Sequence, residues 1–420
     1  MLKKRLYHKV LKRLLKFFKK LLGYKLKGHR LTRLRSLAAF IAGMISNKSS
    51  HLAAIGQGLI QLIKAHSQAK AARKFVYNKA IDYDNYYLPY VKELVQLVLP
   101  ILPSTHSIEL VIDGSQMGKN HAVLMISLVF GKRGIPLGWS VKKGSKGHFT
   151  KAHHIELIRQ VQKDFAGVFP TDRTIMLLGD GEFGSIDAQE CCLDDHWDYA
   201  FRIACNTILY KEEIPFSPKQ IGVASLEDYS SIALEVEQDE EEKKDLPFYL
   251  TNQSEWELPD GLQIPVVQNH TFVEDVLFSK KRFGGVHFTL WHDPKHKKPV
   301  PLISNVADAR FVIQAYDKRY SIECLFKDLK STSFNLHKTR LKDADAISNL
   351  IMIAAFAFTL LMELGTLYKK HPVRAYIHQV RPDQVVQSFY TLALGLVEFF
   401  LREDIDFEFD ELVPIPIPGL

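Results

Sequence analysis

The chain has 420 residues, of which 46% are hydrophobic and 24% charged, a balance typical of a globular protein with two or three domains. Its four cysteines form no Cys-x-x-Cys pair, which excludes a disulfide scaffold and argues against a zinc ribbon. The net charge of +8 is unevenly distributed: residues 1–81 carry 20 Lys and Arg and no acid, which leaves a net −12 on the remainder. Such a division predicts a polyanionic partner.

The first segment, residues 2–22, repeats apolar residues at helical spacing with lysines and arginines between them. We expect a basic amphipathic helix that docks its apolar face on this chain or on a second subunit and contacts DNA with its basic face. A helix lying on a membrane surface is the alternative. Lysines recur through Lys20, a pattern that differs from a signal peptide and favours a cytoplasmic protein.

Residues 30–75 have the outline of a helix-turn-helix. A basic stretch leads into the apolar run Leu37–Ile45, and a polar turn separates this run from a second helix expected over His51–Ile63. Gln57 and Gln61 are available for base edges. The candidate DNA-binding cations on and after this helix are Lys64, Lys70, Arg73 and Lys74.

From residue 107 the pattern changes to β-strands. The expected order is three strands (107–112, 122–130, 135–141), a helix (153–165), a strand (174–178), a helix (185–195) and a strand (199–204). This β-β-β-α-β-α-β order predicts an α/β fold with a mixed five-stranded sheet flanked by helices.

Residues 206–306 interrupt this rhythm and predict a β-rich insertion. Their short strand-like runs are Ile232–Val236, Phe248–Leu250, Val286–Trp291 and Val300–Ser304. An acidic run, Asp239–Glu242, lies between the first two. Helices are expected to return at 309–330, 344–368 and 384–400. The apolar stretch from Ala346 to Met362 is short for a membrane span, so we expect a buried core helix.

Two aspartates follow apolar runs. Asp113 comes after Leu110-Val111-Ile112 and Asp180 after Met176-Leu177-Leu178-Gly179, and each precedes a glycine. We expect both at the carboxyl ends of neighbouring strands, where a cleft forms. Two close carboxylates need a cation, and oxygen ligands favour Mg²⁺ or Mn²⁺. The alternative is that each aspartate only caps the following turn.

A third carboxylate lies in the helix expected over 309–330. In a continuous α-helix Tyr316, Arg319, Glu323 and Lys330 would form one stripe about 60° wide. A carboxylate bracketed by cations suits a nucleic-acid phosphodiester. Lys327 on the same helix is a further candidate for DNA contact, and an ordinary solvated charged face is the alternative.

The pattern Tyr-x2-Arg-x3-Glu-x6-Lys, with Val-Ile-Asp-Gly-Ser and Leu-Leu-Gly-Asp-Gly-Glu-Phe-Gly-Ser upstream, resembles bacterial insertion-sequence transposases of the DDE type. The nearest resemblance is to the family named for its Tyr-Arg-Glu-Lys signature. It implies an RNase H-like core, interrupted by the β-rich insertion and preceded by an all-α DNA-binding domain. Asp113, Asp180 and Glu323 would bind two Mg²⁺ or Mn²⁺ ions, and Tyr316, Arg319 and Lys330 would hold the DNA end.

The resemblance also implies partners and domains. The partners would be double-stranded terminal inverted repeats and target DNA, bound by a homodimer at the bacterial nucleoid and without a membrane. The expected domains are a helical end-binding domain (1–100), the first part of the core (105–205), the insertion (206–306), the second part of the core (307–370) and a C-terminal helix and tail (371–420). Many members have Arg or Ala after the second aspartate, whereas this chain has Gly181 followed by Glu182, which could contact a metal or cap the next helix.

Several alternatives remain. Residues 179–184 match the dinucleotide fingerprint Gly-x-Gly-x-x-Gly, although no acid ends the next strand. His148, His153 and His154 could contact DNA, and Trp291 could stack on an extruded base, but core packing would explain Trp291 as well. A domesticated or unrelated nuclease of the same fold, or a DNA-binding protein without catalytic activity, would also fit the charge pattern.

Overall fold

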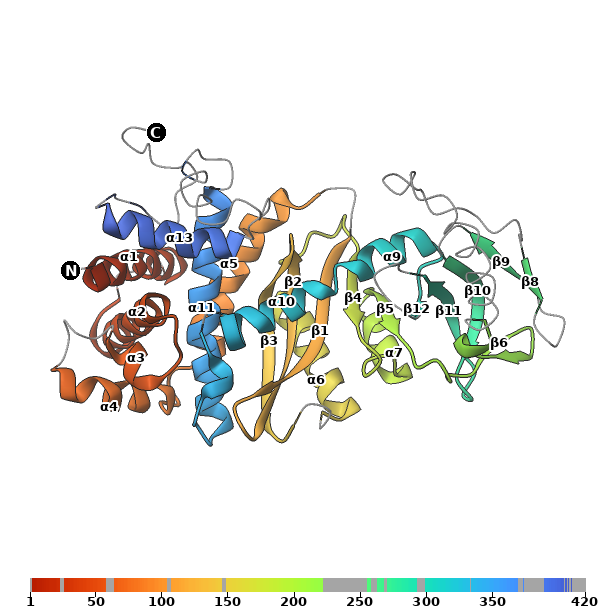
Figure 1. Cartoon of the computed structure of the whole chain (residues 1–420), viewed down its shortest axis with the longest axis horizontal. Helices are drawn as coiled ribbons and strands as arrows, with labels where there is room; N and C mark the ends of the chain where they lie inside the picture. Colours follow the sequence, from red (N-terminus) through yellow and green to blue (C-terminus); the bar gives the residue numbers. More distant parts are fainter. Residues whose placement is uncertain are drawn as a thin grey trace, which may run out of the picture.

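The fold is that of a computed structural model of the whole chain (Figure 1). The residues that it describes are 2–22, 26–57, 64–103, 107–145, 149–221, 255–257, 263–267, 270–292, 299–332, 334–368, 373, 389–403, 405, 407 and 409.

Helices form one end of the molecule (Figure 1). In chain order they are α1 (Leu2–Leu22), α2 (Gly28–Asn47), α3 (Leu52–Gly56), α4 (Ala65–Val76), a π-helical turn (Tyr83–Tyr87), α5 (Leu88–Val98) and a short 3-10 turn (Leu99–Ile101). Two later helices, α11 (Ala344–Leu367) and α13 (Phe389–Arg402), pack against them. The end of the chain that is rich in positive charge is therefore joined to the C-terminal helices.

The apolar face of α1 is buried against this helical group. Leu6, Val10 and Leu14 have no exposed surface, and α1 contacts α2 and α13. The Arg13 guanidinium forms an ion pair with Glu363 of α11 (Nε–Oε2 3.4 Å), and Tyr90 donates a hydrogen bond to the same carboxylate. The expected docking of this helix on its own chain is confirmed.

Helix α3 covers the first part of the second helix expected over 51–63, and residues 58–63 lie outside the described residues. It packs closely against α4: a Cβ on Gly56 would lie 2.7 Å from the Gln68 carbonyl oxygen. Lys3 donates a hydrogen bond to the Gln57 side chain, so this amide is already engaged. Gln61 lies outside the described residues.

The centre of the molecule is a mixed sheet. Its first five strands are β1 (Ile108–Met117), β2 (His121–Phe130), β3 (Arg133–Lys143), β4 (Ile175–Gly179) and β5 (Asp198–Arg202). They lie in the order β3-β2-β1-β4-β5, with β1, β4 and β5 parallel and the first three strands in an antiparallel meander. This is the predicted mixed α/β sheet.

Helices cover both faces of this sheet (Figure 1). Strand β2 is buried along its whole length, since α6 (Lys151–Phe165) and α10 (Tyr320–Lys327) both contact it. Helix α7 (Ile186–Asp194) packs on α6 and β5. Burial on two sides explains why these strands read as continuous apolar runs instead of alternating ones.

The strands of the insertion extend the same sheet. They are β6 (Leu209–Lys211), β7 (Ile214–Phe216), β8 (Glu255–Glu257), β9 (Gln263–Val267), β10 (His270–Phe278), β11 (Phe283–Trp291) and β12 (Val300–Ser304). Strand β12 pairs with both β5 and β11, which joins the extension to the core strands. The predicted runs at 286–291 and 300–304 lie in strands, whereas those at 232–236, 239–242 and 248–250 lie outside the described residues.

The helix expected over 309–330 is wrong as a single helix. Helix α9 (Ala309–Asp317) ends before α10, and a π-helical turn (Asp328–Thr332) follows α10. At the junction the amides of Lys318 and Arg319 bond to the carbonyls three residues earlier, the tighter pattern of a 3-10 turn. The stripe calculated for a continuous helix therefore does not describe the structure.

Helix α11 is the apolar core helix expected from the sequence. Asp343 caps it by accepting a hydrogen bond from the Ala346 amide (2.8 Å). By length and composition α11 could cross a membrane, and it is the one such helix among the described residues. However, 83% of its most apolar stretch is buried within the protein, which explains its hydrophobicity by packing against the sheet and the other helices.

Candidate active site

Asp113 lies within strand β1, which corrects the expectation that it ends the strand. Strand β1 continues to Met117 and keeps its pairing with β2, where Asp113 faces Met125. Its pairing with β4, in contrast, ends at Ile112 and Gly179. Asp113 is therefore the first residue of β1 without a neighbour on that side, and the sheet opens there.

Asp180 follows the last residue of β4, so the two aspartates continue neighbouring parallel strands in the same register. An Asx turn shapes the chain after it: the Asp180 carboxylate accepts a hydrogen bond from the Glu182 amide (3.0 Å), and the Phe183 amide bonds to the Asp180 carbonyl. The buried Phe183 ring anchors this turn beneath Gly179. The glycine pattern at 179–184 thus forms the turn that carries Asp180.

Glu182 does not cap the next helix. Its side chain is exposed and is not part of the cavity that Asp180 lines. Helix α7 is capped by Ser185, whose hydroxyl accepts a hydrogen bond from the Ala188 amide (3.3 Å). The contact of Glu182 with Asp180 is made through its backbone.

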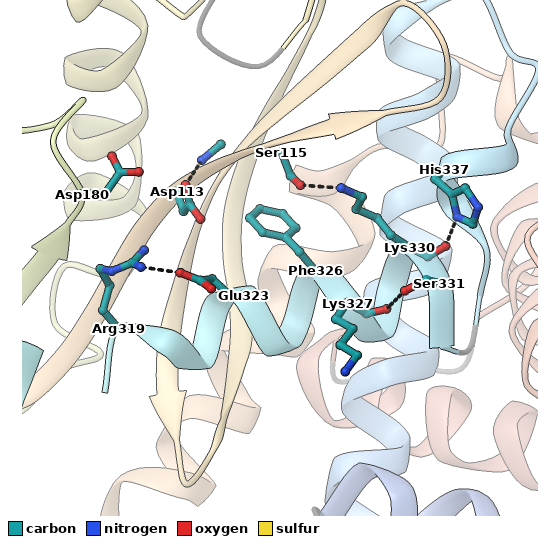
Figure 2. Close-up of a pocket in the computed structure, with 11 residues that line it drawn as sticks. Asp113, Ser115, Asp180, Arg319, Glu323, Phe326, Lys327, Lys330, Ser331 and His337 are labelled. Carbon is teal, nitrogen blue, oxygen red and sulfur yellow. Dashed lines mark hydrogen bonds and ion pairs between the residues drawn. The ribbon is translucent and has the colours of Figure 1, made fainter. Parts of the chain in front are cut away.

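The three predicted carboxylates line one cavity of about 640 Å³ (Figure 2). Asp113 and Asp180 come from the sheet, and Glu323 comes from α10, which crosses the sheet in front of them. The full lining is Asp113, Gly114, Ser115, Asp180, Arg319, Glu323, Phe326, Lys327, Lys330, Ser331 and His337. Three acids and three basic side chains therefore share one open cavity.

Arg319 forms an ion pair with Glu323 one turn further along α10 (Figure 2). Burial alone would lower the pKa of Arg319, but the Tyr316 hydroxyl and the carboxylates of Glu323 and Asp113 raise it, so the guanidinium stays charged. Tyr316 does not line the cavity: it is buried on α9, with the Arg319 guanidinium 5.9 Å from its ring centroid. Burial raises the pKa of Tyr316 to about 12.

Lys330 reaches the cavity from the π-helical turn. Its amine is 3.0 Å from the Ser115 hydroxyl, and its carbonyl contacts the His337 ring (Figure 2). Sequence reasoning missed Ser115, Phe326 and His337. Ser115 was detectable, because it lies two residues after Asp113 and strand alternation places both on one face; nothing in the sequence placed His337 here.

The donor chemistry of the cavity fits a hard divalent cation, since its acids are carboxylates. The Glu323 carboxylate, however, is bound to Arg319. Within the described part of the chain no three His, Cys, Asp or Glu side chains are grouped closely enough to hold a metal ion. Glu323 would have to exchange Arg319 for the metal in order to join Asp113 and Asp180.

The other predicted site residues lie elsewhere. Lys64, Lys70, Arg73 and Lys74 are exposed on α4 or at its N-cap. Trp291 is buried at the end of β11 and does not line the cavity. His153 bonds to Thr150 at the start of α6, and His148 lies outside the described residues.

His154 is buried on α6 with its ring centroid 4.6 Å from that of Phe183. Neither ring nitrogen has a hydrogen-bond partner among the described residues. Burial lowers the pKa of His154 to about 4, an effect that the nearby Asp180 carboxylate partly opposes. A neutral imidazole thus packs behind the turn that carries Asp180.

Residues 105–360, more than half of the chain, match the family model of the transposase DDE domain. The chain belongs to the DDE transposase family. Enzymes of this family break and join DNA strands and generally depend on divalent metal ions. The matched region contains β1, β4 and α10, the three elements that carry the cavity's carboxylates.

Two solved structures show weak similarity. An endonuclease V from Ciona intestinalis, in complex with DNA containing inosine, is 13% identical with a TM-score of 0.27, over 53% of this chain and 84% of its own. The C-terminal lobe of a budding yeast Argonaute is 12% identical with a TM-score of 0.22, over 68% of this chain and 51% of its own. No curated protein matches the sequence.

Proposed function

We propose that this DDE transposase cleaves the ends of a bacterial insertion sequence and joins them to target DNA, as a member of the group with the Tyr-Arg-Glu-Lys signature. The observation that carries the proposal is the shared cavity, in which Asp113, Asp180 and Glu323 come together from three separate segments with Arg319, Lys327 and Lys330. Carboxylates and basic side chains that converge in one open cavity are the arrangement expected of a site that binds metal ions and phosphates.

In this proposal the acids and the bases have different tasks. Asp113, Asp180 and Glu323 would hold two Mg²⁺ or Mn²⁺ ions, which activate the attacking oxygen and stabilise the leaving oxygen of a phosphodiester. Arg319, Lys327 and Lys330 bind the phosphates on either side of the scissile bond and fix the strand for in-line attack. Tyr316 supports the Arg319 guanidinium with its ring.

The remaining parts of the proposal concern the partners. The exposed cations of α4 bind the backbone of the terminal inverted repeat, and two copies of the chain act together because one event cuts two ends. The protein would work on the bacterial nucleoid in the cytoplasm. Trp291 stays a candidate for a base contact only if the extension opens when DNA binds, because its side chain is now buried.

The test uses a duplex that ends in the inverted repeats read from the DNA flanking the gene, together with a target plasmid and Mg²⁺. We expect cleavage at the repeat end and joining of the new 3′ end to the plasmid. Asp113→Asn, Asp180→Asn and Glu323→Gln should each abolish both steps while the protein stays folded. Glu182→Gln is the matched control, since this acid lies two residues after Asp180 but outside the cavity, and it should keep full activity.

The product pattern separates the alternatives. Cleavage without joining would identify a metal-dependent nuclease instead of a transposase. If the three cavity variants cleave like the wild type, these carboxylates do not form the active site. Binding without cleavage by the wild-type protein would favour a non-catalytic DNA-binding protein.

A further inference from the structure

A largely buried ion pair lies close in sequence to residues that line the cavity. Arg133, the first residue of β3, contacts Asp328, the first residue of the π-helical turn, with 2.6 Å between Nε and Oδ2. The Asp328 side chain is 4% exposed and that of Arg133 17%. Neither residue lines the cavity, but Asp328 directly follows Lys327 and comes two residues before Lys330, which both do.

This pair is placed where the backbone changes its geometry. A π-helical turn is rare and advances less per residue than an α-helical turn, so it sets Lys330 at a different angle from a continued α10. The apolar neighbours Leu325 and Leu329 bury this side of the helix, but apolar contacts are not directional. A charged hydrogen bond to a fixed strand end is directional, so it can fix the orientation of the π-helical turn about the helix axis.

The strand end that holds Asp328 is itself fixed tightly. A Cβ on Gly134, the residue after Arg133, would lie 2.5 Å from the Ser127 hydroxyl of β2 and 3.4 Å from Leu325 of α10. Strand β3 therefore approaches both β2 and the helix as closely as a glycine permits. This close packing fixes the backbone next to Arg133.

We propose that Arg133 and Asp328 are positioning residues for Lys330: their ion pair maintains the π-helical turn that directs the Lys330 amine toward Ser115 and into the cavity. The inference rests on the proposed function for the meaning of Lys330, a cation that binds a DNA phosphate. The position of the amine itself can be measured without DNA.

The first experiment measures how fast an amine-reactive ester acylates Lys330 in the folded, full-length protein, read by mass spectrometry against the exposed Lys163 of α6. In Arg133→Leu we expect Lys330 to react several-fold faster and Lys163 to be unchanged. Because that variant leaves Asp328 charged and buried, it can misfold; Arg133→Leu/Asp328→Leu removes both charges and should fold. An unchanged Lys330 rate in either folded variant would overturn the proposal.

Arg13→Leu is the matched control. Arg13 is also a buried arginine paired with a carboxylate, but it lies between α1 and α11, two helices that contribute no residue to the cavity lining. If Arg13→Leu accelerates the acylation of Lys330 as much as the Arg133 variants do, general loosening explains the result and the positioning role is refuted.

The second experiment measures binding of a short DNA duplex over a range of salt concentrations. Removing one protein–phosphate interaction reduces the slope of log K against log salt by about 0.9. We expect this reduction for Lys330→Ala and for Arg133→Leu/Asp328→Leu, and no further reduction when the three substitutions are combined. Additive reductions would overturn the proposal.

The two experiments separate the two ideas. If Lys330 becomes more reactive in the Arg133 variants but Lys330→Ala binds DNA with the wild-type salt dependence, the ion pair positions Lys330 and the proposed DNA contact of Lys330 fails.

Discussion

Arg319 and Glu323 form an ion pair across one turn of α10, and both line the cavity that Asp113 and Asp180 also line. The Arg319 guanidinium therefore competes with a divalent ion for the Glu323 carboxylate. The Arg319 side chain is 19% exposed and that of Glu323 42%, so solvent weakens the pair and an exchange for a metal ion is energetically accessible.

Removing this competitor should strengthen metal binding. For Arg319→Ala we expect Mn²⁺ to bind about fivefold more tightly in the absence of DNA, which corresponds to an ion pair of about 1 kcal/mol. Isothermal titration or the electron paramagnetic resonance signal of free Mn²⁺ measures the affinity. Glu323→Gln is the reference variant and should bind more weakly than the wild type. Equal affinity of Arg319→Ala and the wild type would show that the ion pair does not compete with the metal.

Gly179 and Gly181 provide a comparison on either side of Asp180. A Cβ on Gly179 would lie 2.8 Å from the Phe183 Cβ, whereas a Cβ on Gly181 would meet nothing within 4 Å. Gly179→Ala should therefore lower the free energy of unfolding by about 1–3 kcal/mol, and Gly181→Ala should change it by less than about 0.5 kcal/mol.

Urea unfolding measures these stabilities, and DNA cleavage under conditions where both variants are folded measures the effect on the site. Because Phe183 anchors the turn that carries Asp180, Gly179→Ala should cleave more slowly than Gly181→Ala. Equal stability and equal cleavage would show that the turn absorbs the added methyl group without moving Asp180.

The types of the core elements and their order along the chain could be predicted from the sequence, but the residues at which the elements end were predicted less well. Apolar runs identified β1 to β5, because a sheet covered on both faces needs apolar residues along each strand. The same reasoning ended β1 at Ile112, since it could not show that β1 keeps β2 as a neighbour after its pairing with β4 ends. Asp113 and Asp180 could be predicted because each is an acid after an apolar run and because of the resemblance. Only the structure shows that the pairing of β1 with β4 ends before Asp113, which leaves this side chain at the cavity.

The segment that carries Glu323 could not be predicted from helical spacing alone. Helical spacing alone would place Tyr316, Arg319, Glu323 and Lys330 on one face of a continuous helix. In the structure the helix is interrupted between α9 and α10, and it changes to a π-helical turn at Asp328. Tyr316 leaves the cavity as a result, whereas Lys330 stays in it. In our proposal the ion pair of Arg133 and Asp328 maintains the π-helical turn that carries Lys330. The two residues are far apart in the sequence, so no local sequence pattern predicts their contact.

His154 should make the stability of the protein depend on pH. Its pKa in the folded protein is about 4, below the ordinary value of 6.5. As the pH falls below 6.5 the unfolded chain binds a proton that the folded protein does not, so stability is full above pH 6.5 and is lost toward pH 4. Between pH 7.5 and 5 this group should remove about 2 kcal/mol.

The measurement compares urea unfolding of the wild type and His154→Leu at both pH values, with a chelator present. The leucine variant lacks the titrating ring, so acidification should destabilise it by about 2 kcal/mol less than the wild type. All other groups titrate in both proteins, and their contribution cancels in the difference. Parallel destabilisation would mean that His154 is protonated as easily in the folded protein as in the unfolded chain.

The exposed cations of α4 should contribute to DNA affinity and not to folding. Lys70, Arg73 and Lys74 are exposed, whereas the helix is held by the buried Ala72 and Val76. Changing the three cations to alanine should weaken binding of a terminal-repeat duplex and lower the slope of log K against log salt by about 0.9 for each phosphate that is no longer bound. The melting temperature should stay close to that of the wild type.

The control removes the same charge elsewhere. Lys163, Lys219 and Lys280 are also exposed, but Lys163 lies on α6, Lys219 follows β7 and Lys280 lies between β10 and β11. Their triple alanine variant has the same net charge as the α4 variant, so a purely non-specific attraction would weaken both proteins equally. If α4 belongs to the DNA-binding surface, its variant loses far more affinity than the control. Deleting residues 1–81 could not make this distinction, because it removes helices that pack on α11 and α13 and would unfold the protein.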